Sequence, residues 1–350
     1  MHIPDGYLSP TTCALTWAAA LPFWAVALAR LKRQLHTRMV PLLAVFSAFS
    51  FVIMMFNLPL PGGTTGHAVG VAIATVVLGP WASMVAISIA LLIQAVFFGD
   101  GGITSFGANC LNIAVVGSLV AHWTYTLIAG KADLMAFRRV VAAALAGYLA
   151  INVAALLTAI EFGVQPMFFH DASGTPLYAP YPLSIAIPAM MIGHVSIAGL
   201  AELLISGGLL AYLQRANPDL LTFSRPAASF DAARATRRLW LGLAALMIAS
   251  PLGLLAAGTA WGEWGVEDFA NPATRVEILN ASGQVAPPEA APQGLERLAS
   301  LWTAPIPDYA PSFMHSASFG YILSAMLGSG LILLAFLLIS RFASRKAVDA

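Results

Sequence analysis

Long apolar runs alternate with short polar clusters along the chain, and each run is about as long as a bilayer core is thick. This pattern predicts an all-α polytopic membrane protein with nine helical spans. The expected spans are 10 to 30, 39 to 57, 67 to 79, 80 to 98, 107 to 130, 139 to 161, 182 to 212, 239 to 258 and 317 to 340. The third and fourth come from one apolar stretch, which we divide at Gly79-Pro80 because this pair favours a turn.

A polar stretch divides the chain into two membrane modules. We predict a cytoplasmic linker at residues 213–238, because this stretch is polar and contains Asn217-Pro218. Before it lies a seven-helix module, residues 1–212, and after it a two-helix hairpin, residues 239–350. The loop of this hairpin, from about 259 to 316, is rich in proline, glycine and acidic residues, and we expect it to be extracytoplasmic.

Composition supports a membrane protein. The chain is 59% hydrophobic and 9% charged, whereas soluble domains have about 25% charged residues. A formal net charge of +1 argues against nucleic acid as a partner.

The distribution of charge predicts the orientation of the chain. An odd number of spans places the termini on opposite sides of the membrane. If the amino terminus is outside, all Lys and Arg except Arg275 and Arg297 fall in cytoplasmic stretches, which the positive-inside rule favours. The last external loop is then acidic, with Glu263, Glu267, Asp268, Glu277, Glu289, Glu296 and Asp308. If residues 67–98 formed one span, every later loop would change sides, and the Lys and Arg residues would no longer gather on the cytoplasmic side.

The amino terminus differs from a secretory signal peptide. No Lys or Arg precedes the first apolar run, so we expect this end to be retained. Because His2 is bulky, we also expect Met1 to stay in place with a free amine.

Met1 and His2 together contain three nitrogen atoms that suit a transition metal. The Met1 amine, the His2 backbone nitrogen and His2 Nδ1 would form one five-membered and one six-membered chelate ring around one ion. Such square-planar nitrogen sites suit Ni(II) and Cu(II) better than Zn(II) or Mg(II). His67, in a glycine-rich turn before the third span, is the candidate fourth ligand. The alternative is that His2 is an accident of sequence and that His67 is a solvated residue of an external turn.

Two further residues are candidates for supporting this site. Asp5 and Asn109 are candidates for orienting a ligand histidine, because their side-chain oxygens are suited to accept a hydrogen bond from its ring. Asn109 ends the glycine-rich loop 99–109, which is suited to cover a bound ion or simply to connect two spans.

The seventh span contains two ionisable residues, His194 and Glu202, which are costly within a bilayer and therefore candidates for function. On an ideal helix they project within about 80° of each other. They would then line a polar seam or contact a partner. Alternatively, Glu202 lies at the membrane interface.

Several chemistries are not supported. Cys13 and Cys110 lie in or beside apolar runs, so they predict buried thiols and no disulfide framework. The chain has no Gly-x-x-x-x-Gly-Lys-Ser/Thr loop and therefore no expected ATP site. It also lacks His-Glu-x-x-His and Gly-x-Ser-x-Gly, which lowers the case for a hydrolase.

Four features of the first 212 residues are specific: Met1-His-Ile-Pro-Asp-Gly-Tyr-Leu-Ser9, His67 in its glycine turn, Gly102-Ile-Thr-Ser-Phe-Gly-Ala-Asn109 and the segment from Gly193-His194 to Glu202. With these features the region resembles the CbiM/NikM family, the substrate-specific (S) subunits of energy-coupling-factor (ECF) transporters for cobalt and nickel. The resemblance implies that the metal is held by Met1, His2 and His67. Cys110 stands where the family usually has a hydrophobic residue.

Residues from about 239 to 340 resemble the N component of these systems, fused to the first module. The resemblance rests on Ser250-Pro-Leu-Gly-Leu-Leu, Gly258-Thr-Ala-Trp-Gly-Glu-Trp264 and Ala304-Pro-Ile-Pro-Asp-Tyr309.

The resemblance implies a substrate-capture subunit for Ni(II) or Co(II), which are transported substrates and not cofactors. The implied partners are a transmembrane coupling (T) subunit and two cytoplasmic ATPase subunits. The implied location is the plasma (inner) membrane of a prokaryote. We expect nickel to be preferred, because nitrogen ligands favour the ion placed later in the affinity series. A passive metal channel and a membrane-bound metal-dependent enzyme remain alternatives.

Overall fold

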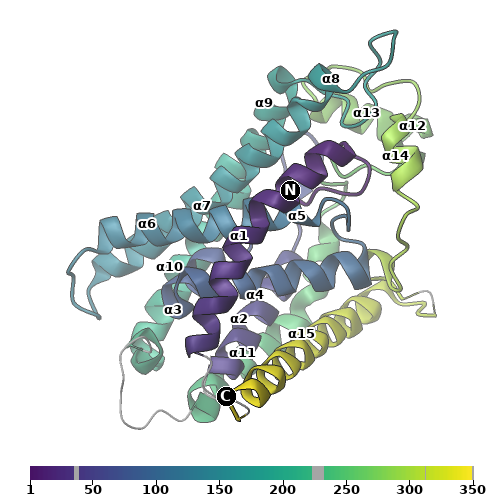
Figure 1. Cartoon of the computed structure of the whole chain (residues 1–350). Helices are drawn as coiled ribbons and strands as arrows, with labels where there is room; N and C mark the ends of the chain where they lie inside the picture. The colour runs from purple at the N-terminus through teal and green to yellow at the C-terminus, as the bar shows by residue number, and fades with distance from the viewer. Residues whose placement is uncertain (35–38, 223–231, 312, 349–350) are drawn as a thin grey trace.

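The computed structural model describes residues 1–34, 39–222, 232–311 and 313–348. In these ranges the chain is a bundle of long helices with one short two-stranded sheet (Figure 1). Helix α1 runs from the amino terminus toward the end of the bundle where α15 ends. The predicted all-α polytopic fold is therefore confirmed.

The amino-terminal module is built from ten α-helices, three π-helical segments and a hairpin in the described residues. Its elements are α1 (Pro10–Gln34), α2 (Met39–Met54), β1 (Leu58–Leu60), β2 (Thr64–Gly66), α3 (Val71–Leu78), α4 (Pro80–Ile93), η1 (Gln94–Phe98), α5 (Phe106–Asn109), η2 (Cys110–Val116), α6 (Gly117–Ala129), α7 (Phe137–Gly163), α8 (Gln165–Phe168), α9 (Leu183–Gly193), η3 (His194–Ala198) and α10 (Gly199–Ala216).

Two long helices and a folded loop follow. Their elements are η4 (Pro218–Thr222), α11 (Ala232–Ala249), η5 (Ser250–Leu255), α12 (Val266–Ala270), α13 (Pro272–Ala281), α14 (Gln293–Leu298), η6 (Pro307–Tyr309) and α15 (Ala317–Val348). Because α10 continues to Ala216 and α11 begins at Ala232, the connection is shorter than the predicted linker 213–238. Residues 223–231 of that linker lie outside the described residues.

Of the nine predicted spans, the third was expected to be short, and the structure shows that the second and the third are both shorter than a full span. Seven described helices are long and apolar enough to cross a membrane, and Met39–Met54 is a shorter apolar helix. The predicted span 67 to 79 contains only α3, whose 8 residues extend about 12 Å. The predicted turn is present, since Gly79 has a φ of 82° and Pro80 starts α4.

The hairpin explains why α3 is short. Strands β1 and β2 pair antiparallel, with Leu58 opposite Gly66. Residues 67–70 then cross to α3, and Gly70 takes a φ of 73°, a left-handed conformation that other residues rarely adopt. The segment that begins with His67 is therefore a loop inside the bundle.

Three spans contain π-helical segments, η1, η2 and η3. Such segments are rare and occur frequently at functional sites. η1 ends directly before the loop 99–105, η2 follows this loop after the short helix α5, and η3 begins at His194. The region around the loop 99–105 and His194 is therefore a candidate functional site.

The carboxyl-terminal helices pack against the first module. Helices α11 and α15 contact α2, which is buried along most of its length. Helix α1 instead exposes Leu15, Leu21 and Leu28, as expected for a lipid-facing helix. The segment with α12, α13 and α14 lies beside α8 and the amino terminus, at one end of the bundle (Figure 1).

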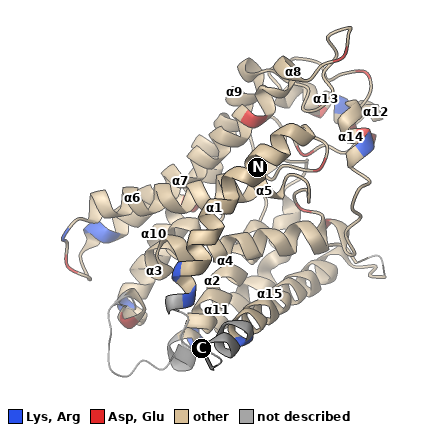
Figure 2. Cartoon of the chain, in the orientation of Figure 1, with Lys and Arg blue, Asp and Glu red and all other residues tan. Residues whose placement is uncertain are grey.

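Charged residues are unevenly distributed. Most described Lys and Arg lie at the opposite end from α12–α14, around which acidic residues gather (Figure 2). Arg38 and Arg225 lie outside the described residues, as do the side chains of Arg33, Arg234, Arg345 and Lys346. This distribution is consistent with the predicted orientation, which stays a prediction.

Candidate metal site

The first three residues are buried in the protein. Met1 is 2% exposed, His2 is 1% exposed and Ile3 is fully buried. The Ile3 N–H donates to Asn109 Oδ1 at 2.8 Å. The Ile3 carbonyl accepts from the N–H of Gly102 at 2.8 Å and from Asn109 Nδ2 at 3.1 Å. The loop 99–109 therefore binds the backbone of Ile3. We call residues 1–5 the amino-terminal strand, although they pair in no sheet.

Asp5 and Asn109 support this strand in a different way from that predicted. The Asp5 carboxylate accepts hydrogen bonds from the N–H groups of Ile103 and Thr104, at 3.0 and 2.7 Å. The hydrogen bonds described for Asp5 and Asn109 go to backbone groups and to the Thr104 hydroxyl, and none goes to a histidine ring. Both residues thus fix the strand and the loop relative to each other.

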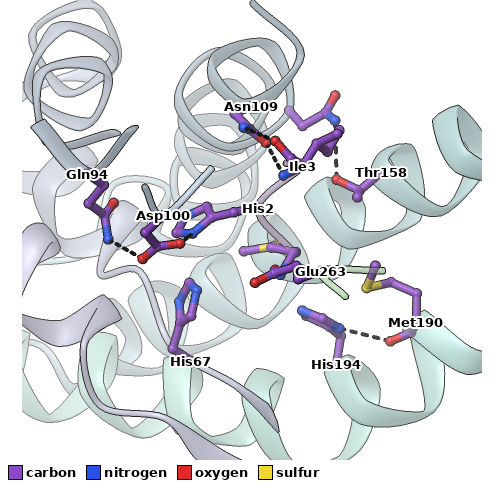
Figure 3. Close-up of polar contacts among 12 residues, drawn as sticks. His2, Ile3, His67, Gln94, Asp100, Asn109, Thr158, Met190, His194 and Glu263 are labelled. Carbon is purple, nitrogen blue, oxygen red and sulfur yellow. Dashed lines mark hydrogen bonds and ion pairs between the residues drawn. The ribbon is translucent and has the colours of Figure 1, made fainter. Parts of the chain in front are cut away.

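The carboxylate that contacts His2 is Asp100, which the sequence did not single out. Asp100 Oδ1 is hydrogen-bonded to His2 Nδ1 (Figure 3). Asp100 Oδ2 accepts from Tyr309 Oη at 2.6 Å and from Gln94 Nε2 at 3.1 Å. Burial alone raises the pKa of Asp100, but His2, His67 and Tyr309 together hold that pKa below its ordinary value. The Asp100 group is therefore a carboxylate facing an imidazole.

His67 lies beside His2. The centroids of the two rings are 4.9 Å apart, and His67 is 6% exposed, so it is not a solvated turn residue (Figure 3). His67 Nδ1 donates to the Ala68 carbonyl at 3.1 Å, which leaves Nε2 as its potential acceptor atom. Burial, followed by the charges of His2 and the Met1 amine, lowers the pKa of His67 well below its ordinary value. The neutral ring that results is the form that binds metals.

Glu202 holds the loop that carries His67. Its Oε2 accepts from the N–H groups of Val69 and Gly70 at 2.7 and 2.8 Å, and its Oε1 accepts from Ser206 Oγ at 3.1 Å. Glu202 is fully buried inside the protein, and its depth in the membrane stays a prediction. It caps the amino-terminal end of α3, where a carboxylate is favourable.

Met1, His2 and His194 are buried. Some of their nitrogen atoms contact a carboxylate, and others have no hydrogen-bond partner. The Met1 amine donates to Glu263 Oε1 at 2.8 Å. His2 Nε2 is buried without a hydrogen-bond partner. His194 Nδ1 donates to the Met190 carbonyl at 2.8 Å, and its buried Nε2 has no partner. The His194 ring points toward Glu263 in Figure 3.

The predicted ligand set stays a prediction. Among the described residues, no three or more His, Cys, Asp or Glu side chains are arranged to hold a metal ion. The predicted set differs from such a cluster because two of its four donors are main-chain nitrogens. In the structure the amine donates to Glu263 and His2 Nδ1 contacts Asp100, so a metal would have to compete with both carboxylates. Cys13 and Cys110 are buried and free.

Known proteins resemble both parts of the chain. Residues 2–220 match the family described as the cobalt uptake substrate-specific transmembrane region, and residues 235–345 match the PDGLE domain. The fused nickel transport protein NikMN of Rhodobacter capsulatus is 60% identical over 332 residues, which is 95% of each chain. The probable fused nickel transport protein LarMN of Lactiplantibacillus plantarum is 41% identical over 97% of each chain.

A solved structure resembles the first part. A transition metal transporter superposes with a TM-score of 0.59 and 48% sequence identity, covering 64% of this chain and 98% of that one.

Proposed function

Because the chain belongs to the CbiM family of cobalt uptake substrate-specific transmembrane regions, with a PDGLE domain fused behind it, we propose that it captures Ni(II) or Co(II) for uptake. Related proteins are named as nickel transport proteins, which supports nickel as the substrate. Nickel is also the ion that the predicted nitrogen ligands favour over cobalt.

The observation that carries this proposal is the burial of an amino terminus beside two histidines. Placing a charged amine in the protein interior is costly unless a partner compensates for it. Here the buried amine donates to Glu263, and the neighbouring His2 ring contacts Asp100 and lies beside the His67 ring. A structural role alone does not require three nitrogen donors and two carboxylates at one buried point.

The proposed binding reaction exchanges protons for a metal ion. The metal takes the Met1 amine, the His2 backbone nitrogen, His2 Nδ1 and a nitrogen of His67. Amines and amides bind metals only in their deprotonated forms, so binding releases protons. Asp100 and Glu263 then supply negative charge near the divalent ion, whose candidate ligands Met1, His2 and His67 are buried.

The proposed transport cycle needs other subunits. The sequence contains no ATP-binding loop, so we assign the energy source to two ATPase subunits that act through a transmembrane coupling subunit. With the proposed orientation, the site receives the ion from outside the cell and releases it inward.

An extension by one glycine ahead of Met1 tests the proposal most directly. The added residue converts the amine of Met1 into an amide and lengthens a buried strand. We expect nickel affinity to fall by more than about 100-fold, beyond the loss that outer-shell changes usually cause. The measurements are nickel content of the purified protein, with its terminus checked by mass spectrometry, and nickel uptake by cells that also express the partner subunits.

The matched control adds one glycine after Ala350, which leaves the amino terminus unchanged. The alternatives predict a different outcome, because a passive channel or a membrane enzyme would tolerate either extension. Normal nickel binding by the chain extended at Met1 contradicts the proposal.

A further inference from the structure

Two residues of the carboxyl-terminal domain reach the amino-terminal dipeptide from different sides. Glu263 Oε1 accepts from the Met1 amine at 2.8 Å. Tyr309 Oη donates to Asp100 Oδ2 at 2.6 Å, and the other oxygen of Asp100 contacts His2 Nδ1. Met1 is thus held directly by Glu263, which is 262 positions away. His2 is held by Tyr309 through the intermediate carboxylate of Asp100.

These contacts are not made by other parts of the chain. In the described residues, the one hydrogen-bond partner of the Met1 amine is Glu263. The first module contributes Asp100, which contacts His2, and Gln94, which donates to Asp100 at 3.1 Å, but the shorter hydrogen bond to Asp100 comes from the Tyr309 hydroxyl, which also accepts from Gln94. The first module by itself would therefore leave a buried amine without an acceptor.

The position of Glu263 is fixed by its neighbours. The Tyr7 hydroxyl donates to the carbonyl of Trp264 at 2.8 Å, and Ala260 forms a β-bridge with Thr65 in strand β2. Gly258 lies so close to the Gly63 carbonyl that a Cβ would have no room there. The turn that carries Glu263 is therefore attached both to the amino-terminal strand and to the hairpin that precedes His67.

The position of Tyr309 is also well defined. Asp308 and Tyr309 have φ angles of 53° and 59°, a conformation that non-glycine residues rarely adopt and that is frequent at functional sites. The Tyr309 ring stacks on Phe98 with centroids 4.8 Å apart. Its backbone carbonyl accepts from Ser324 Oγ of α15 at 2.9 Å, so a membrane helix of the second domain holds it in place.

We propose that the carboxyl-terminal domain completes the metal-capture site, with Glu263 as the positioning residue for the Met1 amine and Tyr309 as the positioning residue for His2 through Asp100. The chemical class of its ligand, a divalent transition metal bound by nitrogen, rests on the function proposed above. Glu263 also brings one of the two negative charges that a buried divalent ion requires. Attached in this way, the domain fixes the donor atoms before the ion arrives.

Substitutions at Glu263 in the full-length protein test this proposal. We expect Glu263→Gln to weaken Ni(II) binding by about 10- to 100-fold, the usual effect of removing a group that orients a ligand. Glu263→Asp retains the charge and should recover most of the affinity. A purely structural role would instead make Gln, which is closer in shape, the better replacement.

The control is Glu277→Gln, because Glu277 is an exposed carboxylate on α13 in the same loop. The measurements are isothermal titration of the detergent-solubilised protein with NiCl2 and the nickel-dependent rise in its unfolding temperature. Tyr309→Phe provides an independent arm in case Glu263→Gln does not fold, with an expected loss of about tenfold or less for one neutral hydrogen bond.

The outcomes separate the two proposals. If the unaltered chain does not bind Ni(II) or Co(II), the proposed function fails. If it binds and Glu263→Gln and Tyr309→Phe bind with the same affinity as Glu277→Gln, the metal-capture function stands and the role of the carboxyl-terminal domain is overturned. An affinity order of Asp above Gln at position 263 supports the role assigned to its charge.

Discussion

The two halves of the candidate site are held by different parts of the protein. Met1 and His2 lie on an extended strand whose contacts come from the loop 99–109 and from the carboxyl-terminal domain. His67 lies on a loop whose backbone is bound by Glu202 of α10, within the membrane bundle. The loop 99–109 and the second domain contact the first half directly, whereas the backbone of the second half is held by Glu202 of the bundle and the second domain reaches only the hairpin before it.

Replacing His67 by alanine tests whether both halves are needed, and it is expected to have the largest effect in this comparison. Without the imidazole, the amino-terminal nitrogens have no fourth ligand from the chain. We expect nickel affinity to fall by more than about 100-fold, beyond the loss typical of outer-shell partners. Titration with NiCl2 measures this, and the unfolding temperature without added nickel should change little because the loop is held through Val69 and Gly70. Unchanged affinity would assign the whole site to Met1 and His2.

Replacing Glu202 tests whether the bundle positions His67. Glu202→Ala leaves the buried N–H groups of Val69 and Gly70 without an acceptor, and each such loss costs about 1–3 kcal/mol. We expect a lower unfolding temperature and nickel binding weakened by about 10- to 100-fold. Glu202→Gln is the matched variant, because its side-chain oxygen still accepts both hydrogen bonds.

The comparison fails if Glu202→Ala binds nickel with normal affinity, since His67 would then not depend on the bundle. Equal defects in Glu202→Ala and Glu202→Gln would instead assign the effect to the lost charge. Nickel titration and thermal unfolding of both variants distinguish these outcomes.

Much of the fold follows from local features of the sequence. The long apolar runs predicted the bundle, and Gly79-Pro80 predicted the turn between α3 and α4. The predicted span 67 to 79 was too long because its first residues are held in a loop by Glu202, which is 132 positions from Gly70. No periodicity in the sequence reports such a contact.

The candidate site was predicted only in part. Met1, His2 and His67 were singled out by the chemistry of their own atoms, and the structure places the two histidine rings side by side. Asp100 and Glu263 were missed, because an acidic residue in a loop is usually solvated and only the fold brings these two to the amino terminus. The separation of Glu263 from Met1, 262 positions, shows why one sequence does not reveal the pair.

The smallest expected effect concerns Asn109, which contacts the strand and not the histidine rings. Asn109→Ala removes the acceptor of the Ile3 N–H and one of the donors to the Ile3 carbonyl. Gly102 and Ser105 still donate to that carbonyl, so the strand keeps part of its support. We expect nickel affinity to fall by roughly tenfold, which corresponds to about 1.4 kcal/mol, because only the Ile3 N–H is left without its partner. Because Asn109 acts only on the amino-terminal half, combining Asn109→Ala with Glu202→Ala should give additive losses in binding free energy, as independent sites do. A combined loss well below the sum would mean that the two halves are coupled through the protein, and the division between loops and bundle would have to be abandoned.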